Sequence, residues 1–359
     1  MPDPFGTFRG KPWTASTTPK PDCLVADVHA HVSVPESAKL AAEHLDPSQD
    51  PRLRYADPRS TAYNRLMNAE IAGKLTGSAE RLADMDAMGV DVQLLSIAPP
   101  QYLYRAEPDL GEQISRMQND RIAEIAAQAP RRLIPMGTLP LQAPRIAQAE
   151  LRRITEDLSF RGIEIDTNVR GTDLDAPEHA WLWAEAERRD LTVILHPHGF
   201  SHAERLGEYY LTNVIGLPLE SCIALSRLIL SGVLERHPDL KLVAVHGGGF
   251  LPQYAARTDH AWEQRPETRQ RIPRRPSEYL GRVHFDTTTH SADAVALLVA
   301  RYGAEQVLLG TDYPFDMGET DPVALITAAG LDAPQAELVL GGNVRRLLGA
   351  GIERPAHPG

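Results

Sequence analysis

The sequence has 359 residues, of which 42% are hydrophobic and 24% are charged. This composition is ordinary for a globular protein, and the length is sufficient to bury a large core. The formal net charge of −11 argues against a nucleic-acid partner, because binding to phosphates requires a basic surface. The two cysteines, Cys23 and Cys222, are far apart, which argues against a disulfide framework and against a cysteine-based zinc site.

The first residues form a polar, proline-rich stretch that lacks the apolar centre of a signal peptide. No run of about 18 apolar residues occurs in the sequence, which predicts that no segment spans a membrane. We therefore expect a cytoplasmic protein. Residues 1–23 are interpreted as an N-terminal extension and residues 351–359 as a C-terminal tail.

Between these ends, short apolar runs rich in β-branched residues alternate with longer amphipathic segments. Continuous apolar runs are typical of parallel strands that are buried on both faces. Strands that alternate with helices predict an α/β fold, and eight such strands predict a (β/α)8 TIM-like barrel over residues 24–350. The expected strands are 24–28, 90–97, 132–139, 162–165, 191–195, 242–245, 283–285 and 307–309, and helices are expected at 109–128, 143–157, 177–189 and 217–235.

A doubly wound open sheet is the competing interpretation. Such a sheet normally carries a glycine-rich phosphate turn after its first strand, whereas this chain has His-Ala-His there. Residues 34–78 interrupt the alternation, because they are polar and contain several prolines. We interpret this segment as a small insertion, a lid or subdomain, between strands 1 and 2.

His29 and His31 close the first expected strand. Alternate residues of a strand face the same way, so both imidazoles should point together into the mouth of the barrel. Imidazole is a common ligand of zinc and other transition metals, and two imidazoles on one face make half of a metal site. A pair of hydrogen-bonded core histidines is the alternative for these two residues alone.

Three further candidates follow later strands: His196 after strand 5, His246 after strand 6 and Asp312 after strand 8. Catalytic groups of a (β/α)8 barrel gather at the carboxyl ends of its strands. The sequence therefore predicts a site in which His29, His31, His196 and Asp312 hold one Zn²⁺ per subunit, with Mn²⁺, Co²⁺ or Fe²⁺ also compatible.

His246 remains as the expected acid–base group beside the metal, with a fifth ligand or an indirect role as the alternative. Three glycines follow it, and they allow close backbone approach or a helix N-terminus that favours an anion. His290 ends strand 7 and is expected to line the substrate pocket, and Asp286 should point into the same mouth. Phe315 follows Asp312 and is expected to stack on a planar substrate, although a core position is equally compatible.

Several motifs resemble those of a known family. They are DVHAH, GTLPLQAP, LTNVIGLPLE, HGGGFLPQYAAR and LLGTDYPFD. Over residues 25–348 the chain resembles the amidohydrolase superfamily and, within it, the branch of the α-amino-β-carboxymuconate-semialdehyde decarboxylase. This resemblance implies a zinc-dependent decarboxylase without an organic cofactor, with the four ligands above and with His246 activating a metal-bound water.

The resemblance also implies two arginines that hold a substrate carboxylate. One lies on the helix after the HGGG turn and reaches into the neighbouring subunit's site; Arg257 stands at that position, which implies a homodimer. The other belongs to the insertion between strands 1 and 2. Arg52, Arg54, Arg59 and Arg65 are all available there, and we favour Arg65.

Two positions distinguish this chain within the superfamily. The family has an aromatic residue two positions after the strand-5 histidine, whereas this chain has His198, which is expected to contact the substrate. Superfamily members with two metals bridge them through a modified lysine on strand 4. That strand reads Arg-Gly-Ile-Glu-Ile-Asp-Thr and contains no lysine, so a single metal is favoured.

We therefore expect a metal-dependent, non-oxidative decarboxylase of a small carboxylic acid, either a hydroxylated aromatic or a muconate-semialdehyde-like compound. The metal would act as a Lewis acid and align the breaking bond. Asp312 would deliver the proton, or His246 would first activate water for addition to the substrate. The alternatives are a mononuclear zinc hydrolase or hydratase that opens a lactone or amide, and a scaffold that retains the metal for stability.

Overall fold

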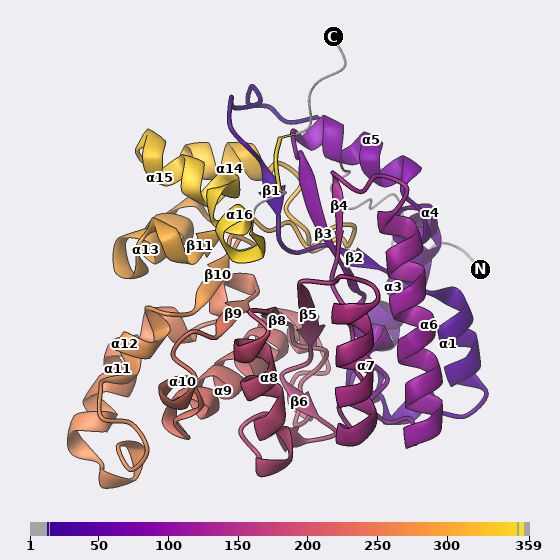
Figure 1. The fold of residues 1–359 in the computed structure, drawn as a ribbon. Coiled ribbons are helices and arrows are strands. Elements are labelled where there is room, and N and C mark those ends of the chain that lie inside the picture. Colours follow the sequence, from indigo (N-terminus) through magenta and orange to yellow (C-terminus); the bar gives the residue numbers. More distant parts are fainter. Residues whose placement is uncertain (1–12, 14, 350–351, 355–359) are drawn as a thin grey trace.

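The computed structural model describes Trp13, residues 15–349 and residues 352–354. Its centre is a group of short parallel strands, with helices outside them (Figure 1). The strands at the centre are β1 (Ala26–Asp27), β2 (His31–Val32), β3 (Val92–Ile97), β4 (Leu133–Pro135), β5 (Gly162–Ile165), β8 (Thr192–Leu195), β9 (Lys241–Ala244), β10 (His284–Asp286) and β11 (Val307–Leu308). A small antiparallel hairpin, β6 (Asn168–Val169) with β7 (Thr172–Asp173), follows β5.

These strands close into a ring. β3 pairs in parallel with β1, β2 and β4, and β5, β8, β9, β10 and β11 pair in parallel in that order. Single parallel bridges join the two sheets, from Gly137 to Ile163 on one side and from Ala30 to Tyr313 on the other. β1 and β2 belong to one continuous stretch of chain and count as one strand of the barrel. The ring therefore contains all eight expected strands. The predicted (β/α)8 barrel is confirmed, although its strands are shorter than the apolar runs.

The side chains of successive strand residues separate into two layers of core. Inside the barrel, Leu94 of β3, Ile194 of β8 and Val243 of β9 belong to one apolar cluster, which also contains Val344 and Leu347 of the last helix. Neighbouring strand residues pack outward in a second cluster beneath the surrounding helices. This alternation is what a parallel barrel requires, since both faces of each strand are buried.

Helices follow the strands around the barrel. Those after β2 are α1 (Pro35–Ala42), α2 (Pro51–Arg54), α3 (Pro58–Glu70), α4 (Ala72–Thr76) and α5 (Ala79–Met88). The middle of the chain has α6 (Pro108–Ala126), α7 (Pro144–Glu156), α8 (Ala180–Arg188), α9 (Leu217–Leu230), α10 (Val233–Arg236), α11 (Leu251–Gln264) and α12 (Pro276–Leu280). The last are α13 (Ala292–Tyr302), α14 (Pro322–Ala328), α15 (Ala333–Glu337) and α16 (Asn343–Leu348). Short 3-10 or π-helical turns are η1 (Pro47–Gln49), η2 (Pro99–Gln101), η3 (Pro177–His179), η4 (Thr212–Gly216), η5 (His246–Gly248), η6 (Pro266–Thr268), η7 (Ala304–Gln306) and η8 (Leu338–Gly342).

Sequence spacing and caps explain where these helices form. In α6 the residues Ile114, Ile122 and Ile125 are buried on one face, which is the stripe that an amphipathic helix packs against a core. α13 begins where the hydroxyl of Ser291 accepts a hydrogen bond from the backbone N–H of Ala294, as expected of an N-cap residue.

The predicted insertion, residues 34–78, forms α1 to α4. Two of these helices begin at an aspartate followed by proline: Asp50 accepts a hydrogen bond from the N–H of Arg52, and Asp57 accepts one from the N–H of Arg59. An aspartate N-cap with proline at the first helical position is a common helix start. The insertion therefore has defined helices that lie beside the mouth of the barrel.

The helix expected at 217–235 is two helices, α9 and α10, and this expectation was wrong. The chain turns at Gly232, whose φ is 78°, in the left-handed region that favours glycine. A Cβ atom at this position would lie 2.9 Å from the backbone oxygen of Arg271. The turn lets α10 depart from the direction of α9.

Among the described residues, one helical segment, Thr212–Leu230, is long and apolar enough to cross a membrane, with a mean hydropathy of 1.4. Length and composition alone are weak evidence, because core helices of globular proteins satisfy the same criterion. In this chain Ala224, Leu225 and Leu228 of α9 are buried in the core beneath the helices. These side chains of α9 thus pack against the core, while Val214 and Ile223 of the same segment remain partly exposed.

Glu220 of α9 allows a prediction about stability. Burial raises the pKa of its carboxyl to about 7, and the negative charge of Asp166 adds to that effect. Between its ordinary pKa of 4.5 and 7 the folded state therefore holds more protons than the unfolded state, so stability falls as the pH rises. The free energy of unfolding can be measured with urea at pH 5 and at pH 8. Between these two pH values it should fall by up to about 3 kcal/mol more in wild type than in Glu220→Gln. Identical pH dependence of both proteins would contradict this.

Candidate metal centre and active site

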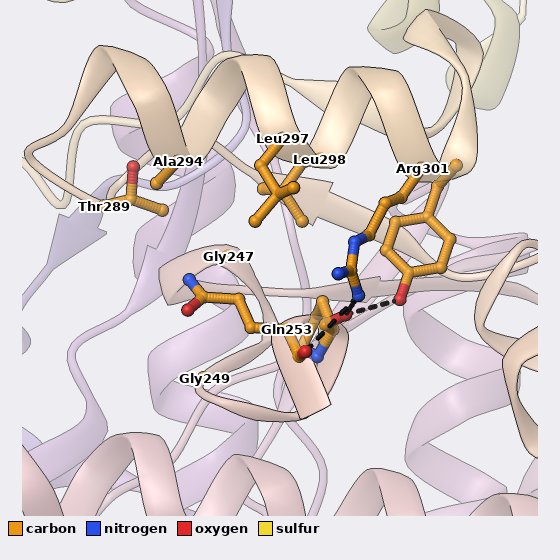
Figure 2. A pocket seen from close by; sticks show the side chains of 10 residues that line it. Gly247, Gly249, Gln253, Thr289, Ala294, Leu297, Leu298 and Arg301 are labelled. Carbon is orange, nitrogen blue, oxygen red and sulfur yellow. Dashed lines mark hydrogen bonds between the residues drawn. The ribbon is translucent and has the colours of Figure 1, made fainter. Parts of the chain in front are cut away.

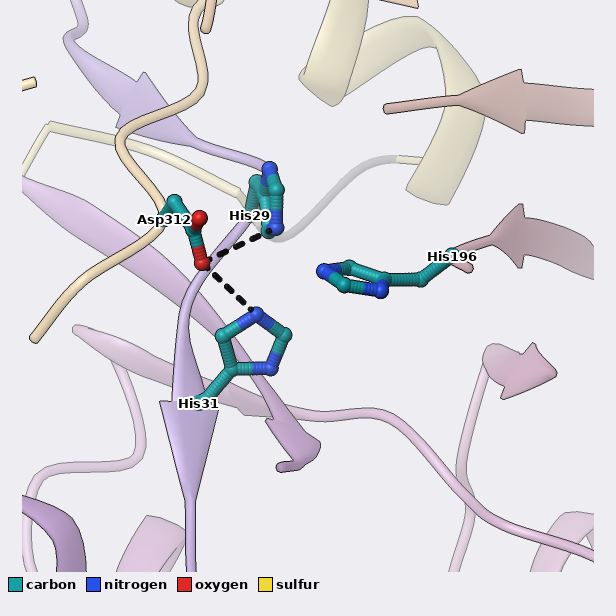
Figure 3. Close-up of side chains that lie close together, drawn as sticks. All are labelled: His29, His31, His196 and Asp312. Carbon is teal, nitrogen blue, oxygen red and sulfur yellow. Dashed lines mark ion pairs between the residues drawn. The ribbon is translucent and has the colours of Figure 1, made fainter. Parts of the chain in front are cut away.

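Four side chains meet at the carboxyl end of the barrel (Figure 3). His29 and His31 come from the first strand, His196 follows β8 and Asp312 follows β11. All four are buried, and one ligand atom from each lies within 4.8 Å of the others. Asp312 Oδ1 is 3.4 Å from Nε2 of His29 and 3.2 Å from Nε2 of His31.

The inward nitrogens of these histidines fit a metal. Within the described part of the chain, the buried Nε2 atoms of His29, His31 and His196 have no hydrogen-bond partner. Burying a polar atom without a partner is unfavourable, and a metal ion would supply what these nitrogens lack. Three imidazoles and one carboxylate are a donor set for zinc and related transition metals. A buried metal-binding site is therefore present.

The outer nitrogens of the same rings are held in place. His29 Nδ1 lies 2.6 Å from Asp286 Oδ2, and Asp286 Oδ1 accepts a hydrogen bond from the N–H of Gly247 at 2.9 Å. His196 Nδ1 lies 2.9 Å from the backbone oxygen of Pro197. A carboxylate or carbonyl behind a metal-binding histidine fixes its orientation and tautomer. Asp286, expected in the mouth of the barrel, is therefore the partner of His29.

Charge and burial set the protonation of these groups. Burial opposes protonation of His29, but Asp312 and Asp286 outweigh it and raise its pKa to about 9. Burial and the neighbouring histidines lower the pKa of His196 well below its usual range. Burial opposes ionisation of Asp312, yet the nearby imidazoles of His29, His246 and His31 hold the pKa of its carboxyl well below the usual range. The neutral His196 and the ionised Asp312 are thus ready to act as ligands.

His246 lies beside the four-residue group and outside it. Its Nε2 is 3.6 Å from Asp312 Oδ2, and its ring centroid is 5.0 Å from that of His196. The backbone at His246 has a φ of 55°, and the three glycines that follow also have positive φ. This tight turn, η5, projects the imidazole toward the metal-binding group from the neighbouring strand.

The turn is supported from behind by α13 (Figure 2). Arg301 donates hydrogen bonds from Nη1 to the backbone oxygens of Pro252 and Gln253, at 3.1 and 3.3 Å, and the hydroxyl of Tyr302 donates to the oxygen of Pro252 at 2.8 Å. A small cavity lies between these side chains and the backbone of Gly247 and Gly249. The first turn of α11, which directly follows the glycine turn, is thereby held to α13.

An open pocket of about 1050 Å³, including its solvent-filled mouth, leads to the metal-binding group. His196, His246 and Asp312 form its floor, and Arg52 of the insertion and Phe315 lie on its walls. The ring of Phe315 is 5.5 Å from that of His31, so an aromatic surface adjoins the metal-binding group. The site can therefore accept a small molecule of planar shape beside a metal.

A family model described as amidohydrolase matches residues 26–350 of this chain. The chain belongs to the amidohydrolase family. The 2-amino-3-carboxymuconate-6-semialdehyde decarboxylase of Dictyostelium discoideum is 35% identical over 271 residues, which are 75% of this chain and 76% of the relative. The resemblance to that branch of the superfamily is thus confirmed.

Solved structures of amidohydrolase-related decarboxylases share the fold. The 5-carboxyvanillate decarboxylase of Sphingomonas paucimobilis is 26% identical, with a TM-score of 0.80 over 91% of this chain and 99% of the other. The dihydroxybenzoic acid decarboxylase of Polaromonas sp. JS666 is 22% identical, with a TM-score of 0.75 over 91% of this chain and 97% of the other. That structure contains bound manganese and the inhibitor 2-nitroresorcinol.

The candidate substrate-binding arginines occupy different environments in this amidohydrolase. Arg65 lies on the exposed side of α3, whereas Asn64 and Asn68 of the same helix line the pocket. Arg52, one of the alternatives to it, lines the pocket together with the metal-binding residues. Arg257 is exposed on α11.

The other expected substrate residues border two openings. His198 lines the pocket beside Arg52 and lies 3.3 Å from Asp50. His290 borders a second opening that also reaches His246 and Asp312. The carboxylate of Glu319, 3.7 Å from the imidazole, raises the pKa of His290.

One functional neighbour escaped the sequence analysis. Glu164 of β5 is fully buried, with Oε1 3.8 Å from His31 Nδ1. It accepts hydrogen bonds from Ser96 at 2.7 Å and from Tyr102 at 2.8 Å, and burial raises its pKa. The available signal was a carboxylate between two isoleucines in an otherwise apolar strand, because such a residue must have polar partners inside the fold.

Proposed function

We propose that this amidohydrolase is a metal-dependent, non-oxidative decarboxylase of a small carboxylic acid that is a hydroxylated aromatic or a muconate-semialdehyde-like compound. The observation that carries the proposal is the buried group of His29, His31, His196 and Asp312, which opens onto a pocket containing Arg52. The named activities of the Dictyostelium and Sphingomonas relatives support the same reaction class.

His29, His31, His196 and Asp312 would hold the ion, and a bound metal would act as a Lewis acid toward substrate oxygens. In the reaction, the bond to the carboxylate breaks, CO2 leaves, and the remaining carbon takes up a proton. Two groups of the chain are available to hold that proton, the Asp312 carboxyl and the imidazole of His246. Arg52 would bind an acidic oxygen of the substrate, and Phe315 would stack on its ring.

The proposed function is tested by incubating the metal-loaded protein with hydroxybenzoates, pyridine carboxylates and semialdehydes. Release of CO2 without net addition of water supports the proposal. Ring opening or hydrolysis without CO2 would refute it and would favour a hydrolase or hydratase. An aromatic substrate is the first to try, since the Sphingomonas relative acts on carboxyvanillate by name and Phe315 lies beside the metal-binding group.

We propose zinc as the ion, one per subunit, because three histidines and one aspartate suit its preference for four ligands. The Polaromonas decarboxylase contains manganese, so metal analysis should follow expression in medium that contains both ions. About one zinc per chain in the active protein would support the proposal. Activity that depends on the manganese content instead would refute the proposal of zinc, but it would not affect the proposal that the enzyme is a decarboxylase.

We further propose that the protein is a cytoplasmic homodimer. In each subunit residues 24–350 form the catalytic barrel, and residues 34–78 form its lid. The flanking segments 1–23 and 351–359 lie largely outside the described residues. Support for the dimer comes from apolar side chains exposed on neighbouring elements, since Val214, Ile223, Phe250 and Tyr254 are between 37% and 63% exposed. Apolar side chains grouped on one surface indicate a contact with another molecule. Arg257 lies on the same helix as Tyr254.

A mixing experiment tests the role of Arg257. Arg257→Ala and His246→Ala should each be inactive when purified alone. After subunit exchange, a heterodimer would contain one site with both residues intact, so roughly a quarter of wild-type activity should return. An Arg257→Ala protein that keeps full activity, or a mixture without recovered activity, would contradict a contribution across the subunit interface.

A further inference from the structure

The insertion lies directly on the loop that follows β8. Gly199 in that loop has no side chain, and a Cβ atom there would come within 3.1 Å of Pro51 Cβ and 3.2 Å of Arg52 Cγ. Farther along, the hydroxyl of Tyr55 donates a hydrogen bond to Glu204 at 3.0 Å. Helix α2 therefore rests against the backbone of the barrel loop, only a few residues after the metal-binding His196.

One polar contact at this junction joins a buried carboxylate to a partly buried imidazole. His198 Nε2 lies 3.3 Å from Asp50 Oδ1, and Asp50 is 6% exposed. His198 is fixed to the barrel, because its backbone N–H donates to Asp166 Oδ1 at 3.0 Å. The contact thus connects a fixed point of the barrel with the N-cap residue of α2.

Asp50 in turn accepts two hydrogen bonds from Arg52. Its Oδ1 accepts the backbone N–H of Arg52 at 2.9 Å, and its Oδ2 accepts the guanidinium Nη2 at 3.0 Å. Among the described residues, the buried Nε of Arg52 has no hydrogen-bond partner. The guanidinium is therefore oriented by Asp50 and keeps donors for another acceptor while it lines the pocket.

We propose that His198 and Asp50 are positioning residues that hold Arg52 in the pocket, and that this contact determines how tightly the enzyme binds an acidic substrate. The proposal rests on the proposed function and adds a role for His198. An arginine side chain loses conformational entropy when it binds a ligand, and orienting it beforehand reduces that loss. The contact should therefore affect substrate binding and not the chemical step.

The test compares His198→Phe and Asp50→Asn, each in wild type and in Arg52→Ala. Asparagine still caps α2, because its side-chain oxygen accepts the N–H of Arg52. Each variant should raise the KM of the acid that releases CO2 by about tenfold, and it should raise the Kd of 2,6-dihydroxybenzoate by the same factor. The kcat should change by less than about twofold. In the Arg52→Ala background neither should have a further effect. An increase that persists without Arg52 would overturn the proposal, because His198 would then act directly.

Two further variants separate positioning from general damage. His198→Gln keeps an N–H donor and should return KM to within about threefold of wild type. Tyr55→Phe removes a lid-to-loop hydrogen bond that does not involve Arg52, and it should leave KM unchanged. Metal content should be equal in all of these proteins. A His198→Gln protein as impaired as His198→Phe would count against the polar contact with Asp50.

Hydrogen exchange provides a readout that needs no turnover. His198→Phe should increase amide exchange in residues 47–55 by about tenfold, because the junction of α2 with the barrel loosens. Unchanged exchange there would overturn the proposal. If no tested acid releases CO2, the proposed function fails, but exchange and the Kd of 2,6-dihydroxybenzoate still decide whether His198 positions Arg52.

Discussion

Replacing His246 by asparagine should lower kcat by about 10²–10⁴-fold, the usual contribution of a general acid–base group. The imidazole lies 3.6 Å from Asp312 and on the floor of the pocket, so it can reach the reacting part of a bound acid. It is not one of the four residues that form the metal-binding group. We therefore expect metal content and melting temperature to remain close to wild type, which separates a catalytic loss from loss of the ion.

Asparagine is the better replacement because of the backbone. His246 has a φ of 55°, and asparagine tolerates this left-handed conformation better than alanine does. His260→Ala is a matched control, since His260 is exposed on α11 and should leave kcat within about twofold of wild type. A His246→Asn enzyme with normal turnover would remove His246 from the mechanism, and a metal-free one would make it a ligand.

The barrel and its ligands were predictable for the same physical reason. A parallel strand buried on both faces produces a continuous apolar run, and the residue after that run lies at the carboxyl end where the site is built. His196 follows such a run directly, and Asp312 lies three residues after the end of its run at Leu309. The position of His196 is therefore set by its strand, whereas Asp312 lies in the segment after β11 and has a φ of 59°.

The insertion could not be predicted in the same way. Arg65 and Arg52 lie on different helices, and which of them faces the pocket depends on how those helices pack against the barrel. The sequence does contain local information, since Asp50-Pro51 is a helix start that places Arg52 in the first turn of α2. The contact of Asp50 with His198 joins residues far apart in the sequence, and a single sequence has no periodic signal for such a pair.

Asp286→Asn should lower metal affinity by about 10–100-fold, the usual effect of removing the group behind a metal-binding histidine. Asp286 Oδ2 is 2.6 Å from Nδ1 of His29, so the carboxylate keeps a proton on Nδ1 and leaves Nε2 free for the ion. Asparagine can still accept the N–H of Gly247 through its oxygen, which leaves its amide group facing His29. An amide donor there favours the tautomer with the proton on Nε2, where the metal must bind.

Competition against a chelator measures this affinity, and Glu164→Gln is the matched comparison. Glu164 is as deeply buried as Asp286, but its oxygen is 3.8 Å from His31 Nδ1, which is too far for a hydrogen bond. We therefore expect Glu164→Gln to change metal affinity by less than about threefold. Activity of Asp286→Asn should recover at high metal concentration, because the catalytic groups of the pocket are intact. Equal affinity of Asp286→Asn and wild type would show that His29 keeps its tautomer without this carboxylate.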